Sequence, residues 1–180
     1  MRIVILNGSP RLKGNTRTAV LEMERGIKEN IKEAETEIID ASIKNIHPCR
    51  GCDACRKNGG NCIQKDDMPD ILNSISQAEA LVFATPVYYW GMTAQLKTLI
   101  DRFYSRAEFH NQKKTIGIFV DGEAELDDPE YRLIKEQIEC ISEYLGWTVK
   151  YVKCVSTSGI DTVAKDDALK KELYDFYKCI

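Results

Sequence analysis

Apolar residues are concentrated in five short runs, and longer stretches of mixed character separate these runs. The runs cover residues 2–6, 36–40, 80–84, 115–120 and 148–154. They are rich in β-branched residues and have the length of strands, so each predicts a β-strand. The first, third and fourth runs are almost continuously apolar, which is typical of parallel strands that are buried on both faces. The second run is the weakest and predicts a strand nearer an edge.

Between the runs, apolar residues recur at every third or fourth position, as they do on one face of a helix. Four such faces are predicted over residues 20–31, 92–103, 131–145 and 168–177. The third ends at Gly146, a common helix terminator. A shorter helix is expected to begin near Asp67, whose carboxylate suits a helix N-terminus. Strands and helices therefore alternate, which predicts an α/β fold with a doubly wound, five-stranded parallel sheet and helices on both faces.

The bulk composition agrees with this picture and argues against some classes of partner. The chain has 180 residues, is 43% hydrophobic and carries a formal net charge of -3. This length suits one domain over residues 1–180. Basic residues are scattered, which argues against nucleic acid as a partner. No apolar run approaches the ~20 residues of a membrane span, and no leader-like segment opens the chain, so we expect a cytoplasmic protein with reduced thiols.

The segment NGSPRLKGNT, residues 7–16, joins the first predicted strand to the first helix. Open parallel sheets bind ligands at such loops, and the helix N-terminus adds partial positive charge. We therefore predict a phosphate site here, with hydrogen bonds from Ser9, Asn15 and Thr16, charge from Arg11 and close backbone approach at Gly14. The segment carries neither the Mg-nucleotide motif nor the dinucleotide fingerprint, so a single terminal phosphate fits best. The alternative is an ordinary turn in which Asn15 caps the helix.

A second informative loop follows the third strand, in the stretch ATPVYYWGMTAQLKTLIDRF at 84–103. It lies beside the first loop if the strand order is 2-1-3-4-5. Three consecutive aromatic residues at 88–90 cannot all be buried from a tight loop, and exposed aromatic clusters mark binding surfaces. Together with the phosphate loop they favour a planar ring on a phosphorylated chain, as in FMN. The alternative is that they form a dimer interface, and Asp101 and Arg102 are interpreted as a surface pair or an interface contact.

Three segments carry a family resemblance: GSPRLKGNT at 8–16, PCRGCDACRKNGGNCIQKDDM at 48–68 and TPVYYWGMTAQLKTLIDRF at 85–103. With them the chain resembles the NADPH-dependent FMN reductase-like and iron–sulfur flavoprotein branch of the flavodoxin superfamily. The resemblance implies a flavodoxin-like fold, tight non-covalent FMN, and a homodimer or homotetramer with FMN near the interface.

The same resemblance assigns residues to FMN. Ser9, Arg11, Asn15 and Thr16 would hold the phosphate, and the isoalloxazine ring would be lined by Pro86, Val87, Tyr88, Tyr89, Trp90 and Gly91. The loop after the fourth strand, DGEAELDD at 121–128, is acidic and unlike the Gly/Ser-rich loops of the family. A third contact with the flavin, and the choice between NADH and NADPH, therefore stay open.

Four cysteines lie in an insertion-like loop at about 47–66: Cys49, Cys52, Cys55 and Cys62. A [4Fe–4S] cluster needs one thiolate for each of its four irons, and the spacing resembles the compact motif of the iron–sulfur flavoproteins. Structural zinc usually takes two separated pairs of ligands, disulfides are disfavoured in a reducing cytosol, and cluster-free relatives keep similar thiols. These alternatives stay open. Cys140, Cys154 and Cys179 lie outside the motif, and neither His47 nor His110 has a clear site.

The expected function is that of an FMN-dependent oxidoreductase. NAD(P)H, or a reduced redox protein, would supply electrons through FMN to a quinone, a flavin, a small electrophile or a ferredoxin-like partner. No catalytic side chain is predicted, because the cofactor carries the chemistry. The alternatives are a non-enzymatic electron carrier like flavodoxin and a thiol redox sensor.

Overall fold

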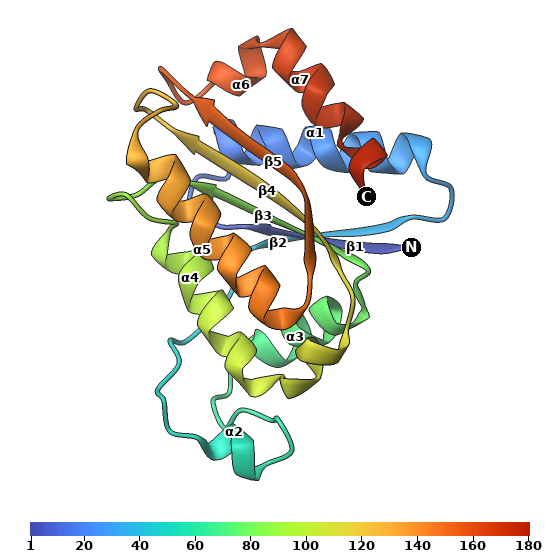
Figure 1. The fold of residues 1–180 in the computed structure, drawn as a ribbon, viewed down its shortest axis with the longest axis vertical. Coiled ribbons are helices and arrows are strands. Elements are labelled where there is room, and N and C mark those ends of the chain that lie inside the picture. The colour runs from blue at the N-terminus through green and yellow to red at the C-terminus, as the bar shows by residue number, and fades with distance from the viewer.

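The computed structural model describes residues 1–180 and is built on one sheet of five parallel strands (Figure 1). These are β1 (Arg2–Asn7), β2 (Glu35–Asp40), β3 (Ala80–Pro86), β4 (Thr115–Gly122) and β5 (Thr148–Ser156). Their order is β2-β1-β3-β4-β5, and every neighbouring pair is parallel, which confirms the predicted strands and topology. The chain winds outward from β1 to β2 and then crosses to β3, so the winding reverses between β1 and β3. Ligands of such sheets bind at that point, beyond the carboxyl ends of the strands.

Helices cover both faces of the sheet. One face carries α1 (Asn15–Asn30), α6 (Thr162–Lys165), α7 (Asp167–Tyr174) and the 3-10 helix η3 (Asp175–Cys179). The other carries α3 (Met68–Gln77), α4 (Ala94–Asp101), η1 (Arg102–Ser105), η2 (Ala107–Asn111) and α5 (Pro129–Leu145). The short α2 (Ala54–Lys57) lies away from the sheet, at one end of the molecule (Figure 1).

The central strands owe their continuous apolarity to these two layers. Alternate residues of a strand point to opposite faces, so Val4 and Leu6 enter one hydrophobic core while Ile3 and Ile5 enter the other. The edge strands β2 and β5 are only partly buried, as the weak apolar run of β2 predicts. The apolar pattern along each strand therefore follows the number of covered faces.

The ends of two helices can be compared with the boundaries that the sequence predicts. Helix α5 ends at Gly146, whose φ of 75° makes it a left-handed C-cap, as predicted. Helix α3 begins directly after Asp67, and the carboxylate of the preceding Asp66 accepts from the Met68 amide at 3.1 Å. The helix thus begins where the sequence predicts, although the Asp67 side chain accepts from the Asn45 amide at 2.8 Å and forms no bond to the first turn. No helix combines the length and apolarity that a membrane crossing requires.

Candidate functional site

A cavity of about 370 Å³ opens where four strands end. Loops after β1, β3, β4 and β5 all contribute to its wall: Arg11, Asn15, Pro86, Val87, Tyr88, Asp121, Gly122, Glu123, Thr157, Ser158, Gly159 and Ile160. The volume lies in the range of ordinary small-molecule sites. The crevice that the strand order predicts is therefore present, and it is open to solvent.

The first helix enters this crevice without a side-chain cap. Gly14 occupies the N-cap position, and no side chain bonds to the amides of the first turn of α1. These amides and the helix dipole suit an anion. The alternative in which Asn15 caps the helix is wrong: its amide nitrogen donates to the Gly159 carbonyl at 2.6 Å, and its side-chain oxygen accepts from Val163 N at 3.0 Å. Asn15 thus ties the first loop to the loop after β5.

The other residues predicted to bind phosphate lie in or under the same loop. Ser9 is buried, and its Oγ accepts from the Arg11 amide at 3.2 Å. The exposed Arg11 lines the cavity. Thr16 is buried, and its hydroxyl donates to Asp121 Oδ1 at 2.5 Å. The five residues thus come together around the start of α1, but Thr16 already has a partner inside the protein.

Asp121 was not among the predicted site residues. It is the penultimate residue of β4 and is 6% exposed, and its carboxyl group accepts a hydrogen bond from Thr16. Burial raises the pKa of Asp121 to about 6, against the opposing effects of the Thr16 hydrogen bond and the Arg11 charge. One feature of the sequence could have pointed to Asp121: the loop at 121–128 is acidic, whereas the corresponding loops of the resembling family are rich in Gly and Ser. Asp121 therefore brings a buried carboxyl group to the wall of the cavity, next to the start of α1.

The aromatic loop after β3 forms a two-residue hairpin turn. Tyr88 N donates to Gly91 O at 2.9 Å and Gly91 N to Tyr88 O at 3.1 Å. Tyr89 and Trp90, at the turn, both have positive φ (47° and 60°), the geometry of a type I′ turn. They are 96% and 56% exposed, which confirms that the three aromatic residues are not all buried.

Only the first half of the predicted ring-binding segment lines the cavity. Pro86, Val87 and Tyr88 form part of its wall. The hairpin tip, residues 89–91, lies outside it, where the loop after β3 projects from the molecule (Figure 1).

Backbone contacts hold the loops in register with one another. Gly8 N donates to Ala84 O at 2.8 Å, and the Thr93 hydroxyl, which caps α4, donates to Gly8 O at 2.7 Å. A Cβ at Gly8 would lie 2.8 Å from Leu96 Cβ, so only glycine permits this approach. The crevice is therefore positioned by the ends of β1 and β3 and by α4.

The loop after β5, residues 157–160, contributes a wall that the sequence reasoning missed. Thr157 N donates to Gly122 O at 2.7 Å, which holds this loop against the end of β4. Its small, hydroxyl-bearing residues directly after a strand were the available signal.

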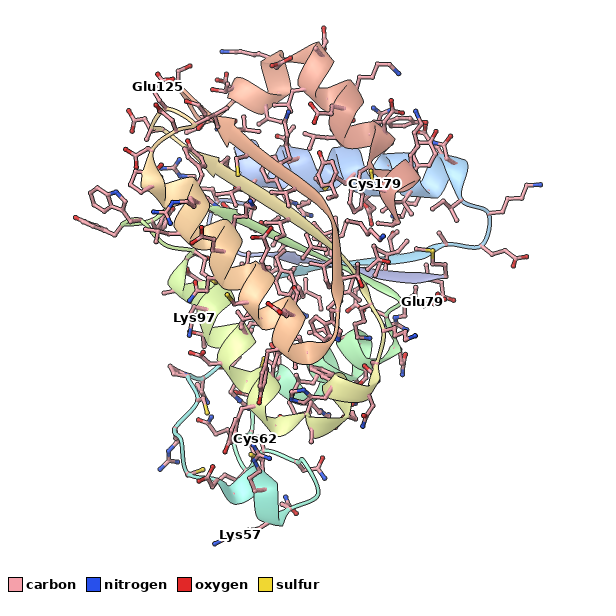
Figure 2. All side chains as sticks on the ribbon, viewed as in Figure 1. Lys57, Cys62, Glu79, Lys97, Glu125 and Cys179 are labelled. Carbon is pink, nitrogen blue, oxygen red and sulfur yellow. The ribbon has the colours of Figure 1, made fainter.

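The four motif cysteines line a second, smaller cavity, together with Arg102, Tyr104 and Ser105. Cys55 is buried and Cys62 half-buried, whereas Cys49 and Cys52 are exposed, and none forms a disulfide. No three thiols, carboxylates or imidazoles converge on one metal-ion position. The two cavities share no residue. Cys62 and Glu125, which follows β4, lie toward opposite ends of the molecule (Figure 2).

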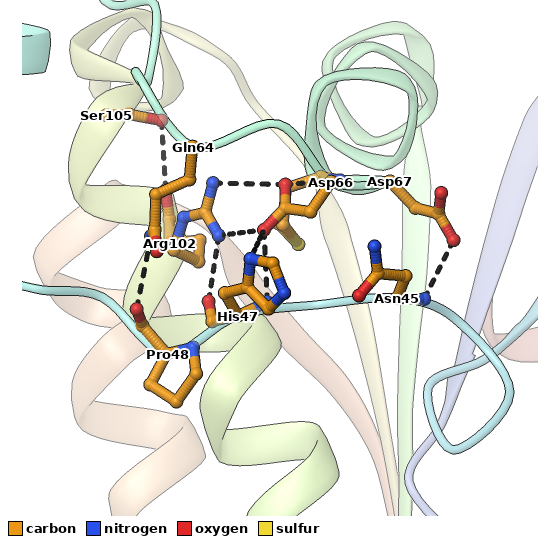
Figure 3. A network of polar contacts seen from close by, with 9 residues as sticks. Asn45, His47, Pro48, Gln64, Asp66, Asp67, Arg102 and Ser105 are labelled. Atoms are coloured by element: carbon orange, nitrogen blue, oxygen red, sulfur yellow. Dashed lines mark hydrogen bonds and ion pairs between the residues drawn. The ribbon is translucent and has the colours of Figure 1, made fainter.

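A buried ion pair closes the base of the cysteine loop (Figure 3). Arg102 Nη1 lies 2.5 Å from Asp66 Oδ2 and donates to the His47 carbonyl at 2.8 Å. Burial disfavours the Asp66 charge, but hydrogen bonds from Arg102, His47 and Met68 outweigh it and hold the pKa of Asp66 below its ordinary value. The interpretation of Arg102 as a surface residue is wrong. Asp101 does lie at the surface, 2.5 Å from Lys97.

Residues 1–135 match the family model for NADPH-dependent FMN reductases. The chain belongs to the NADPH-dependent FMN reductase family. This result confirms the resemblance drawn from the three segments. Relatives of this FMN reductase-family chain include an iron–sulfur flavoprotein of Methanocaldococcus jannaschii, 39% identical over 102 residues that make up 57% of this chain and 51% of that protein. A Bacillus subtilis protein named as a putative NAD(P)H-dependent FMN-containing oxidoreductase is 33% identical over 103 residues. The matched segment covers 57% of this chain and 52% of that protein.

A further relative of this FMN reductase-family chain is the iron–sulfur flavoprotein of Methanosarcina thermophila, 36% identical over 107 residues. The matched segment covers 57% of this chain and 52% of that protein. The chain thus spans about half the length of the curated relatives that it matches.

Solved structures show the same fold at low identity. RosB with a bound flavin-phosphate intermediate superposes with a TM-score of 0.74 at 19% identity, over 98% of this chain and 75% of RosB. An FMN-dependent NADH-azoreductase from Bacillus anthracis, in complex with FMN, gives 0.71 at 13% identity, over 99% and 98%. The flavodoxin-like fold predicted for this FMN reductase-family chain is confirmed.

Proposed function

We propose that this protein is an oxidoreductase that uses bound FMN to carry electrons from NAD(P)H to an acceptor. One observation carries the proposal: an uncapped helix N-terminus, a cationic side chain and an apolar wall meet in one crevice at the winding reversal. This donor set suits a phosphate with an attached ring system. FMN, when bound, would supply hydride acceptance and onward electron release.

The first loop would hold the phosphate. The amides at the start of α1 would donate to its oxygens, Arg11 would neutralise charge from the solvent side, and Gly14 would let the backbone approach. Ser9 fixes the path of the loop through its bond to the Arg11 amide, and Asn15 fixes the start of the helix. Thr16 would add a hydroxyl donor if its present bond to Asp121 were rearranged.

The aromatic loop would hold the ring. Within 87–91, the amide of Val87 already donates to Asp121 O, and those of Tyr88 and Gly91 bond to each other's carbonyls. The amides of Tyr89 and Trp90 therefore remain as backbone donors to a flavin edge. Both side chains are exposed beside the crevice, which supports a role in covering the ring or in meeting a second copy of the chain. A homodimer or homotetramer is part of this proposal.

The experiment is flavin binding followed by turnover. Protein supplied with FMN should bind about one flavin per chain and oxidise NADH or NADPH in the presence of a quinone, free flavin or ferricyanide. Fast exchange with a redox protein but slow NAD(P)H oxidation would favour an electron carrier instead. FMN binding without turnover would favour a thiol redox sensor, and no FMN binding would refute the proposal.

As a second role, we propose that the cysteine loop binds a [4Fe–4S] cluster. All four thiols line one cavity, and several relatives are named iron–sulfur flavoproteins. Four thiols have the right chemistry, but they do not converge in the structure, so binding would draw the exposed Cys49 and Cys52 inward. The cluster would let the protein exchange single electrons with a ferredoxin-like partner. An anaerobic preparation assayed for iron, sulfide, zinc and flavin tests this: about four irons per chain support it, whereas zinc or flavin alone contradicts it.

A further inference from the structure

Asp121 occupies a position that the proposed FMN site does not explain. Its side chain is buried between the start of α1 and the crevice, and it lines the cavity together with Arg11 and Asn15. Its backbone is fixed by β4 and by the Val87 amide, which donates to Asp121 O at 2.7 Å. The backbone of Asp121 is therefore held in place, and the hydrogen bond from Thr16 directs its carboxyl group toward the start of α1.

The charges around Asp121 offer it little compensation. No Lys, Arg or His side chain forms an ion pair with it, and Arg11 acts on it only at longer range. Glu123 lines the same cavity, and Glu130 approaches the neighbouring Gly122. The Tyr131 hydroxyl, whose pKa is raised to about 12 chiefly by burial, also lies near the Asp121 charge. Apart from Arg11 the surroundings are neutral or acidic, and Thr16 is the one side chain that donates to the carboxyl group.

The Thr16 hydroxyl links this carboxyl group to the proposed phosphate. A hydroxyl has one hydrogen to donate. While Asp121 is ionised, that hydrogen is directed at Oδ1, 2.5 Å away, and only oxygen lone pairs remain for a ligand. If Asp121 carries a proton, its O–H can donate to Thr16 Oγ1, and the hydroxyl hydrogen of Thr16 can then turn to a phosphate oxygen. When the hydrogen bond between Thr16 and Asp121 is reversed, Thr16 changes from a group that offers only lone pairs to the phosphate into one that donates a hydrogen bond to it.

We propose that Asp121 couples flavin phosphate binding to protonation: the chain takes up one proton at this carboxyl group when FMN binds, and none when riboflavin binds. The inference rests on the proposed FMN site and deepens it. A dianionic phosphate near the buried carboxylate makes two like charges share one site, which favours the neutral carboxylic acid. Burial already raises the pKa of Asp121 in the free protein to about 6, so protonating this carboxyl group takes less free energy than protonating an exposed one.

The sign of the pH effect follows from linkage. A phosphate monoester loses its second proton near pH 6, so above about pH 7 the charge of FMN is constant. Above about pH 7 the Asp121 carboxyl group is ionised in the free protein, so FMN binding must be accompanied by uptake of one proton from the solvent. The dissociation constant of FMN should therefore rise with pH, by up to about tenfold per unit between about pH 7 and pH 8.5, whereas that of riboflavin should stay level.

The test combines fluorescence titrations of FMN and riboflavin over this pH range with calorimetry in two buffers of different ionisation heat. Calorimetry of the wild-type protein alone should give close to one proton taken up per FMN and none per riboflavin. Asp121→Asn should abolish the FMN slope. Glu123→Gln, which changes an exposed carboxylate of the same cavity, should keep it.

The outcomes separate this inference from the proposed function. FMN binding without proton uptake, or a slope that survives in Asp121→Asn, overturns the role of Asp121 but leaves the FMN site intact. If Asp121→Asn does not fold, the wild-type proton count decides. Failure of both flavins to bind at any pH overturns the proposed function and this inference together.

Discussion

Arg102 and Asp66 form an ion pair with 2.5 Å between Nη1 and Oδ2, and their side chains are 1% and 0% exposed. The pair joins Arg102, which follows α4 as the first residue of η1, to Asp66, where the cysteine loop leads into α3 (Figure 3). The same guanidinium donates to the carbonyl of His47, where that loop departs. One buried cation thus holds both ends of the loop.

Replacing Arg102 should therefore be severe. Arg102→Leu leaves Asp66 buried without its cation and should lower the free energy of unfolding by about 3–5 kcal/mol. Arg102→Leu with Asp66→Leu should recover part of that loss, because the unpaired charge is removed. Lys97→Leu, at the exposed pair with Asp101, should cost less than about 1 kcal/mol. Urea denaturation measures all three.

The same ion pair has a pH signature. The folded pKa of Asp66 is below its unfolded value, so the stability that it contributes is complete above the unfolded pKa of about 4. That contribution is lost as the pH falls through the folded pKa. The stability difference between wild type and the double Leu variant should shrink toward strongly acid pH. A difference that grows on acidification would contradict this assignment.

The exposed Arg11 tests the phosphate site without disturbing the core. Arg11→Gln should weaken FMN binding about tenfold, which corresponds to about 1.4 kcal/mol, through loss of one charge-assisted contact. Riboflavin, which lacks the phosphate, should bind as before. Lys13→Gln, an exposed charge on the same loop that does not line the cavity, serves as the matched control. Equal effects on the two flavins would place the phosphate elsewhere.

The hairpin tip stores strain that a better turn sequence should release. Tyr89 and Trp90 occupy the left-handed region, which costs about 1 kcal/mol or more for each non-glycine residue. Tyr89→Asn with Trp90→Gly should raise the free energy of unfolding by about 1–2 kcal/mol, because Asn-Gly suits a type I′ turn.

The same double variant should weaken flavin binding or self-association, measured by titration and sedimentation. Increased stability with both properties unchanged would show that the aromatic pair has no role in either.

Asp121 should also make the free energy of unfolding depend on pH. Its folded pKa of about 6 lies above the unfolded value, so the neutral form is favoured in the native protein. Stability should fall as the pH rises from about 4 to about 6, by up to about 3 kcal/mol. Asp121→Asn should lack this decrease in equilibrium unfolding measured at several pH values without flavin. A wild-type profile that is level over this range would argue that Asp121 titrates normally.

Iron content separates the motif thiols from the others. In anaerobic preparations, Cys55→Ser should lose most of the iron, since a [4Fe–4S] cluster depends on all four ligands. Cys140→Ser changes an exposed thiol on α5 and should keep it. Similar iron in both variants, or none in the wild type, would remove the cluster from the proposal.

Several features could be predicted because they depend on local pattern. The strands, their burial and the stop at Gly146 follow from side-chain periodicity and backbone preference. The loops after β1 and β3 could be placed side by side because parallel strands have their carboxyl ends at one edge of the sheet. Asp121 and residues 157–160 were assigned no role because neither carries a motif, and their positions depend on the loops that pack opposite them.

The sequence by itself determined the five strands, the longer helices, the family and the crevice edge, since these depend on periodicity and on short contiguous motifs; the short helices α2 and α6 were not predicted. Only the tertiary structure decided which polar groups are paired. Thr16 meets Asp121 across 105 residues, Asn15 meets Gly159 across 144, and Arg102 is buried against Asp66 and not exposed at the surface. The physical reason is that a hydrogen bond or an ion pair depends on distances and burial that arise only when remote segments pack.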